Sequence, residues 1–381
     1  MFKKMPLLLI AIIALVLLLN PFIPVYAKQI LFTISINLKS VILFFLPWII
    51  FSLLFKAVVN LSKNATKVIF YILFFVCLSN FLSTFLSHYI GIVVYHFNLS
   101  LMSPQESHPL KPLWTLHLPT LISNDKAMFS GLLLGFIGST FFQKNSIQLS
   151  IYLEKIVHQI LKLIIYCIPF FIIGFVIKLK YDGVISLILK DYAFIFLIIA
   201  ISQFSYICLW YYALSHFKKK KFFISIRNMF PAALTGFSTM SSAASMPLTI
   251  LGVEKNCSQK EIARSVVPAT VNIHLLGDCF AIPILAFAIL KSFGMPEPSF
   301  INYLIFTFYF VLAKFSVAAI PGGGILVMLP ILEKYLGFKW EMMSLITALY
   351  ILFDPVVTAA NILGNGAFAK WIDKVVKISK K

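Results

Sequence analysis

Charged residues are scarce in this chain, and acidic residues are the scarcest among them. Asp, Glu, Lys and Arg together make up 12% of the 381 residues, and only 13 residues are acidic. In a soluble globular domain roughly a quarter of the residues are charged and about half are apolar. Here 60% are hydrophobic and the mean hydropathy is +0.96. The composition excludes a soluble globular protein and predicts a polytopic membrane protein.

Long polar stretches are also missing, so nothing in the sequence separates a second domain. Apolar segments of about 20 residues, enough for a helix to cross a bilayer, recur along the whole chain. They predict an all-α membrane protein with about eight transmembrane helices, formed as one domain over residues 1–381. The segments are 5–26, 38–60, 68–97, 128–142, 156–178, 191–215, 264–291, 300–317 and 342–370.

The five cysteines are scattered through the chain, and their spacing matches no metal-binding motif. Their odd number also argues against a complete disulfide framework. We expect free thiols, no metal site and no cofactor.

The net charge of +19 comes largely from basic residues that flank the apolar segments. A basic protein can bind nucleic acid, but this distribution is typical of the positive-inside rule of membrane topology. We therefore expect no nucleic acid partner. The expected environment is a lipid bilayer, the bacterial inner membrane, with the N- and C-termini in the cytoplasm. Binding of anionic lipid headgroups is compatible with this topology. The basic groups are Lys3 with Lys4, Lys218 to Lys221 with Arg227, Lys255 with Lys260 and Arg264, and the tail 370–381.

Residues 1–27 also have features of a signal peptide, because Lys3 and Lys4 precede an apolar core that ends in small residues near Ala27. The apolar run is long. The transmembrane segments that follow place the basic groups on the cytoplasmic side only if this run is retained as a span. We expect it to be the first transmembrane helix, with cleavage as the alternative.

Two stretches of small residues interrupt the apolar pattern and indicate re-entrant hairpins. Residues 231–249 are rich in Ser, Thr and Ala, and residues 318–324 contain Pro321 followed by three glycines. Non-helical backbone is tolerated at membrane depth only where it is buried in protein or lines a cavity. Paired interruptions of this kind are typical of the substrate site of a secondary transporter.

Two acidic residues, Asp278 and Asp354, fall deep within apolar segments. An ionisable group there costs a few kcal/mol unless it is paired or solvated, so both are functional candidates. Asp278 follows His274 by four residues, so the alternative is that these two side chains satisfy each other on one helical face. Asp354 begins a polar stripe, continued by Thr358, Asn361 and Asn365, that we expect to face a cavity between the hairpins.

At these residues the chain resembles the dicarboxylate/amino acid:cation symporter family, which includes the glutamate transporters. Residues 234–249 are similar to the family's serine-rich first hairpin, residues 320–324 to the tip of its second, and residues 358–366 to its last helix. The resemblance implies a homotrimer whose protomers have a scaffold part and a transport part that moves like an elevator. It places mostly scaffold helices, with some transport helix, in about 1–220, the hairpins and core transport helices in about 221–370, and a basic tail in 371–381.

The resemblance also implies roles for single residues. Ser241 and Ser242 match hairpin positions that hold the substrate α-carboxylate, which suits the N–H groups of a helix N-terminus. Asp354 matches the carboxylate that binds a substrate ammonium group, with Thr358 next on the stripe, and Asn361 matches an asparagine of the substrate and cation region. The outer gate would be formed by Pro321, Gly322, Gly323 and Gly324.

Three departures from the family pattern bear on substrate and ion. Val357 stands where members with acidic substrates have an arginine, so the bidentate clamp on a second carboxylate is missing and a neutral amino acid is favoured over a dicarboxylate. Asn365 and Leu276 stand where sodium-binding carboxylates would be, and leucine offers no oxygen ligand. The coupling ion is H⁺ or Na⁺. We favour H⁺, carried by Asp278 and His274, because burial disfavours a charged carboxylate and histidine titrates near neutrality.

Other functions remain open from the sequence. With its cation sites lost, the chain is alternatively an uncoupled exchanger, a channel or a sensor. An intramembrane aspartyl protease is a remote alternative, because two membrane aspartates must meet to form an acid/base dyad. We expect a transporter rather than an enzyme.

Overall fold

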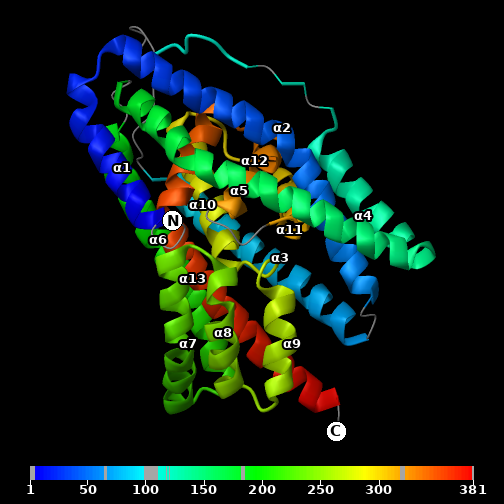
Figure 1. Ribbon diagram of the computed structural model, residues 1–381. Coiled ribbons are helices and arrows are strands. Elements are labelled where there is room, and N and C mark those ends of the chain that lie inside the picture. Colours follow the sequence, from blue (N-terminus) through cyan, green and yellow to red (C-terminus); the bar gives the residue numbers. More distant parts are fainter. Residues whose placement is uncertain are drawn as a thin grey trace. The chain divides into compact units, whose positions relative to one another are not determined.

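A computed structural model describes residues 5–63, 67–97, 110–116, 118–119, 121–181, 185–317 and 322–379. Within these ranges the chain forms α-helices and one short 3₁₀-helix, with no strand, so the all-α prediction is confirmed (Figure 1). The helices are α1 (Met5–Leu19), η2 (Asn20–Phe22), α2 (Val25–Lys63), α3 (Lys67–Tyr95), α4 (Asn124–Phe141), α5 (Gln143–Tyr181), α6 (Ile185–Leu214), α7 (Lys219–Thr239), α8 (Ser242–Asn256), α9 (Lys260–Thr270), α10 (Leu276–Ser292), α11 (Phe300–Lys314), α12 (Gly323–Leu336) and α13 (Trp340–Ser379).

Three described helices are long and apolar enough to cross a membrane: Ile72–Tyr95 in α3, Asp191–Leu214 in α6 and Trp340–Val375 in α13. Shorter apolar stretches lie in α2, α4, α5 and α11. The presence of apolar spanning segments agrees with the sequence, whereas the count of about eight stays a prediction.

The chain divides into two compact units that are not continuous in sequence. One unit comprises residues 1–6, 71–99 and 192–381, and the other comprises residues 7–70 and 100–191. All the candidate site residues belong to the first, which we call the hairpin unit, and we call the second the α2 unit. The division into scaffold and transport parts near residue 220 stays a prediction.

In the α2 unit, the long helix α2 packs along both α4 and α5. The hydroxyl of Ser35 donates a hydrogen bond of 2.7 Å to the carbonyl of Phe171, which holds α2 against α5. Lys56 and Glu154 form an ion pair between the same two helices. Small and polar residues at such contacts are typical of helix packing in membranes, where apolar burial alone does not hold helices together.

In the hairpin unit, α13 is the central helix and packs against α7, α8, α9, α10 and α12. Figure 1 shows α7, α8 and α9 beside the C-terminal part of α13. In α10 every residue except Lys291 is buried. A helix that is apolar all round is expected to lie in the interior, and this carries Asp278, in its first turn, into the core.

Both small-residue stretches lie at junctions between packed helices. α7 and α8 pack together and are joined at Met240 and Ser241, where Met240 has the left-handed φ of 51°. The Ser241 side chain caps α8 by accepting a hydrogen bond of 3.2 Å from the amide of Ala244. α11 and α12 also pack together, and residues 318–321 between them lie outside the described ranges. That these helix pairs are re-entrant in a bilayer stays a prediction.

Candidate functional site

The helical path is interrupted between α9 and α10, within the apolar segment predicted at 264–291, and a neighbouring helix satisfies the exposed backbone groups. The Asn80 side chain, on α3, donates to the carbonyl of Ile273 at 2.7 Å and accepts from the amide of Leu275 at 3.3 Å. Buried peptide groups that are left unpaired by a helix break would otherwise destabilise the fold. The break allows α10 to begin at Leu276 and places Asp278 in its first turn.

Asp278 is 1% exposed and is paired with a buried lysine. The ammonium Nζ of Lys314, at the end of α11, lies 2.9 Å from Oδ2 of Asp278. Oδ1 accepts hydrogen bonds from the Tyr350 hydroxyl at 2.8 Å and from the Asn361 amide at 3.2 Å. Lys314 is fully buried, and its ammonium also lies 4.3 Å from the ring centre of Phe310. Asp278 therefore has one cationic and two neutral partners.

The Lys314 and Tyr350 contacts do not appear in the sequence prediction. A lysine that ends an apolar segment usually extends its ammonium to the membrane surface, so Lys314 looks like an ordinary boundary residue. The available signal was that Lys314 is followed by a further small-residue stretch rather than by a polar loop.

His274 and Asp278 form hydrogen bonds with different partners and not with each other among the described residues. The Nε2 atom of His274 lies 2.9 Å from the Ser79 hydroxyl on α3, and the His274 ring lies 4.5 Å from that of Phe368. The alternative in which His274 and Asp278 satisfy each other is therefore wrong, because the break before Leu276 removes the continuous helical face that this spacing assumes.

Asn365, on the polar stripe of α13, lies next to His274, which belongs to the break between α9 and α10. Its Nδ2 atom donates to the carbonyls of His274 at 3.2 Å and Asn361 at 3.0 Å. The side chains of His274 and Asn365 lie close enough to interact with each other, but within the described ranges the buried atoms His274 Nδ1 and Asn365 Oδ1 have no well-formed hydrogen bond. Unpaired buried polar atoms are uncommon and indicate a place for water, a proton or an ion.

Asp354 is 4% exposed, and among the described residues the hydrogen bonds that it accepts come from neutral groups. Its Oδ2 atom accepts a hydrogen bond of 2.8 Å from the amide of Gly322, and Oδ1 accepts one of 3.1 Å from the Thr358 hydroxyl. Gly322 caps α12 with a left-handed φ of 70°, a conformation that glycine adopts without strain. The amide that precedes α12 is thereby directed at Asp354.

The start of α12 brings the two carboxylates close to the predicted gate. A Cβ atom on Gly324 would lie 2.6 Å from Oδ2 of Asp278 and 2.5 Å from the hydroxyl of Tyr350, so only glycine fits here. Asn361 links the same elements, because its Oδ1 atom accepts a hydrogen bond of 2.8 Å from the amide of Gly277. Gly322, Gly323 and Gly324 are buried or at the helix start in this cluster, whereas Pro321 lies outside the described residues.

Ser241 and Ser242 lie at the junction of α7 and α8, two helices that both pack against α13. α7 lies against α13 at Thr358, since a Cβ atom on Gly236 would lie 3.2 Å from the Thr358 methyl carbon. The Ser241 hydroxyl accepts the local cap hydrogen bond of α8, and Ser242 is buried. Their contact with a substrate stays a prediction.

The three residues that depart from the family pattern, Val357, Asn365 and Leu276, are all fully buried. Leu276 packs against α13, where a Cβ atom on Gly364 would lie 2.8 Å from its Cδ1 atom. Val357 is also without exposed surface. Within the part of the chain that the structure describes, no three His, Cys, Asp or Glu side chains gather as metal ligands.

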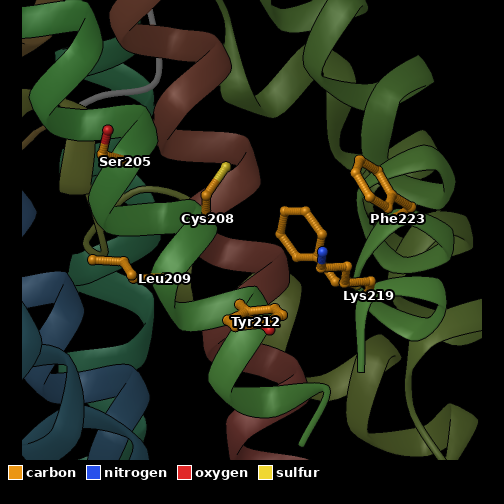
Figure 2. Close-up of a pocket in the computed structure, with 7 residues that line it drawn as sticks. Ser205, Cys208, Leu209, Tyr212, Lys219 and Phe223 are labelled. Atoms are coloured by element: carbon orange, nitrogen blue, oxygen red, sulfur yellow. The ribbon is translucent and has the colours of Figure 1, made fainter. Parts of the chain in front are cut away.

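A separate pocket of about 560 Å³ lies between the end of α6 and the start of α7. Figure 2 shows the side chains of Cys208 and Tyr212, on α6, beside the opening and Lys219 and Phe223, on α7, across from them. Ser205, Leu209 and Phe222 complete the lining. None of the predicted site residues lines this pocket, so it is distinct from the carboxylate cluster.

Comparison with known proteins gives a family match over nearly the whole chain. The model of the sodium:dicarboxylate symporter family matches residues 5–375. An excitatory amino acid transporter of Onchocerca volvulus is 29% identical over 148 residues, which are 39% of this chain and 30% of that protein. Excitatory amino acid transporter 2 of Homo sapiens is 28% identical over 148 residues, 39% of this chain and 25% of the relative. Excitatory amino acid transporter 3 of Mus musculus is 31% identical over 155 residues, 40% and 29% of the two chains. Each match spans less than a third of the relative.

Proposed function

Because the chain belongs to the sodium:dicarboxylate symporter family, we propose that it is a cation-coupled secondary transporter of a small amino acid or dicarboxylate. The observation that carries this proposal is Asp354, a buried carboxylate at the junction of α12 and α13 that has only neutral donors among the described residues. A buried charge is stable only when it is paired or well hydrogen-bonded. Asp354 therefore retains the capacity to bind a cationic group.

The substrate best matched to this geometry carries one ammonium group and one carboxylate. Asp354 would bind the ammonium, with Thr358 and Asn361 beside it, and the N-terminus of α8 at Ser241 and Ser242 would bind the carboxylate. Val357 supplies no charge for a second carboxylate. A neutral amino acid is accordingly preferred over a dicarboxylate or an acidic amino acid.

The amide of Gly322 gives the proposed gate a chemical link to the substrate. A substrate ammonium would compete with this N–H group for the oxygen of Asp354 that now accepts its hydrogen bond. Binding would then release or reshape the start of α12, which is the role that Gly322, Gly323 and Gly324, together with Pro321, have in the proposal. A homotrimer, elevator movement, cytoplasmic termini and a bacterial inner membrane are parts of the same proposal.

For the coupling ion we favour H⁺ over Na⁺. The unpaired atoms of His274 and Asn365 support an exchangeable proton or ion beside Asn361. Asp278 is already paired with Lys314, so His274 is the better proton carrier of the two. Full burial disfavours the charged imidazole, and proton binding would therefore accompany a conformation that opens His274 to water.

The family consists of transporters, and this removes the intramembrane protease from consideration. An uncoupled exchanger stays as a second function, favoured by Leu276 and Asn365 at positions where sodium-binding carboxylates are expected. The two functions differ in whether substrate accumulates against its gradient.

Ligand binding and uptake test the proposal in sequence. The detergent-solubilised protein is first heated with single amino acids and dicarboxylates in sodium, in choline and at low pH, because a ligand at 100 times its Kd stabilises by about 2.7 kcal/mol. Uptake of the ligand that stabilises most is then measured in proteoliposomes with choline replacing sodium and an imposed pH step. Accumulation driven by the inward proton gradient supports the proposal. Passive equilibration identifies an exchanger or channel, and strict sodium dependence without a response to pH excludes proton coupling.

A further inference from the structure

Asp278 and Lys314 form the one ion pair, among the described residues, in which both side chains are fully buried. The carboxylate comes from the first turn of α10 and the ammonium from the last turn of α11. The two groups come from different elements, so the pair joins α10 to the hairpin formed by α11 and α12.

The ends of the two helices make this place favourable for a cation. A helix N-terminus stabilises a negative charge and a helix C-terminus stabilises a positive one. Asp278 lies at the N-terminus of α10, and Lys314 lies where the last carbonyls of α11 point. Helix C-termini and carboxylates at breaks in membrane helices are the groups that bind coupling cations in transporters. The ammonium thus occupies a position with the chemistry of a cation site.

Stability alone does not account for such a pair. Removing two charges from water carries a large free-energy cost, and replacing a buried pair by apolar residues is often neutral or stabilising. Tyr350 and Asn361 complete the hydrogen bonds of the carboxylate, as a built site requires, and Gly324 leaves room for it.

We propose that Lys314 is a tethered cation that occupies the site at Asp278 in place of a free cation. The ammonium neutralises Asp278 permanently and moves with the α11–α12 hairpin, so this site takes up no ion from solution. If the protein transports as proposed above, its coupling ion must bind at a different site, such as that of His274 and Asn365.

The test removes the tethered ammonium and offers a free one. Lys314→Ala leaves Asp278 without a cation and leaves space beside it. The purified full chain is unfolded by heat, without substrate, in choline chloride, sodium chloride or methylammonium chloride at equal ionic strength. Lys314→Ala should unfold at a lower temperature than the wild type in choline, and methylammonium or sodium should recover most of the loss with saturable dependence on concentration. The wild type should gain less than the variant from either ion.

Two further variants make the response specific to Asp278. Lys314→Ala with Asp278→Asn should lose the extra response to cations, because the carboxylate that Lys314 neutralises is then absent, and Asp354 is present equally in every variant. Lys370→Ala is the matched control, since Lys370 is also buried but its hydrogen bonds to described residues go to the hydroxyls of Ser215 at 3.1 Å and Ser225 at 2.7 Å rather than to a carboxylate. It should show no gain in cation response over the wild type.

Two results would overturn the proposal that Lys314 is a tethered cation. If Lys314→Ala responds to cations no more than the wild type, the position is not a cation site. If it folds in none of these salts while the double variant folds, the pair is structural only, and the proposal is again overturned. These measurements contain no substrate, so neither result decides whether the protein transports, and a failure of uptake leaves them unaffected.

Discussion

Asp278 and Asp354 are both buried carboxylates of the hairpin unit, but their partners differ. Asp278 has the ammonium of Lys314 at 2.9 Å as well as two neutral donors. Asp354 has a backbone amide and a hydroxyl at 2.8 and 3.1 Å, and no cation among the described residues. The first carboxylate is neutralised within the chain, whereas the second has no cationic partner in the part of the chain that the structure describes.

The difference separates two roles that the sequence alone treats alike. An acidic residue within an apolar helix is a functional candidate by default, and both residues meet that criterion. Their contacts divide them: one is part of an internal ion pair that links helices, and the other can bind the ammonium group of a substrate. Substitutions of Asp278 should therefore mainly lower stability, whereas substitutions of Asp354 should mainly weaken substrate binding.

The largest loss of stability is expected from Asp278→Asn. This change leaves the ammonium of Lys314 buried without its counter-ion, and breaking a buried pair in this way costs about 3–5 kcal/mol. Thermal and denaturant unfolding of the purified protein measure the loss. Asp278→Asn with Lys314→Met should recover most of it, and Asp354→Asn should lose much less. An Asp278→Asn variant as stable as the wild type would mean that the ion pair is unimportant.

A smaller effect is expected from Gly324→Ala at the start of α12. The added Cβ atom would press on Asp278 and Tyr350, and overpacking of this kind costs about 1–3 kcal/mol. The displaced start of α12 should also move the Gly322 amide and change substrate affinity, which a ligand titration by thermal shift measures.

Gly131→Ala provides the control for Gly324→Ala. Its Cβ atom would lie 2.8 Å from the carbonyl of Phe51 in the α2 unit, which contains neither carboxylate. It should lower stability to a similar degree and leave affinity unchanged. Equal changes in affinity from both alanine variants would contradict a specific role for the start of α12.

The smallest effect is expected from Ser241→Ala. Loss of the cap of α8 costs about 1 kcal/mol of stability, and loss of the proposed carboxylate contact should weaken substrate binding further. Ser299→Ala removes the equivalent cap of α11, where the Ser299 side chain accepts a hydrogen bond of 3.3 Å from the amide of Asn302. If both variants bind substrate equally well, Ser241 acts only as a helix cap.

Much of the helical fold follows from the sequence, but the lengths of its helices do not. Apolar segments mark α3, α6 and α13 because a bilayer requires about 20 apolar residues in a row. α2 and α5 each extend over 39 residues, well beyond the apolar segments predicted in them at 38–60 and 156–178. Hydropathy detects the apolar part of a helix and is insensitive to its polar continuation.

The candidate site was also only partly predictable from the sequence. Asp278, Asp354 and Asn361 are visible in the sequence because polar groups are conspicuous among apolar residues, and the structure brings all three to the start of α12. Lys314 and Tyr350 are not visible, because a terminal lysine and a tyrosine fit a membrane boundary as well as a core. Their role depends on which helices meet, and single-segment patterns contain no information on that.

The central claim, that Asp354 and not Asp278 binds the substrate ammonium, is tested most directly by a thermodynamic cycle. The Kd of the best amino acid ligand and of the same molecule without its amino group are measured for the wild type and for Asp354→Asn. A charged contact in a desolvated site contributes about 1.5–3 kcal/mol, so the wild type should bind the amino acid about tenfold to a hundredfold more tightly than its deaminated analogue. Asp354→Asn should lose this preference. A preference that persists undiminished in Asp354→Asn would contradict the account.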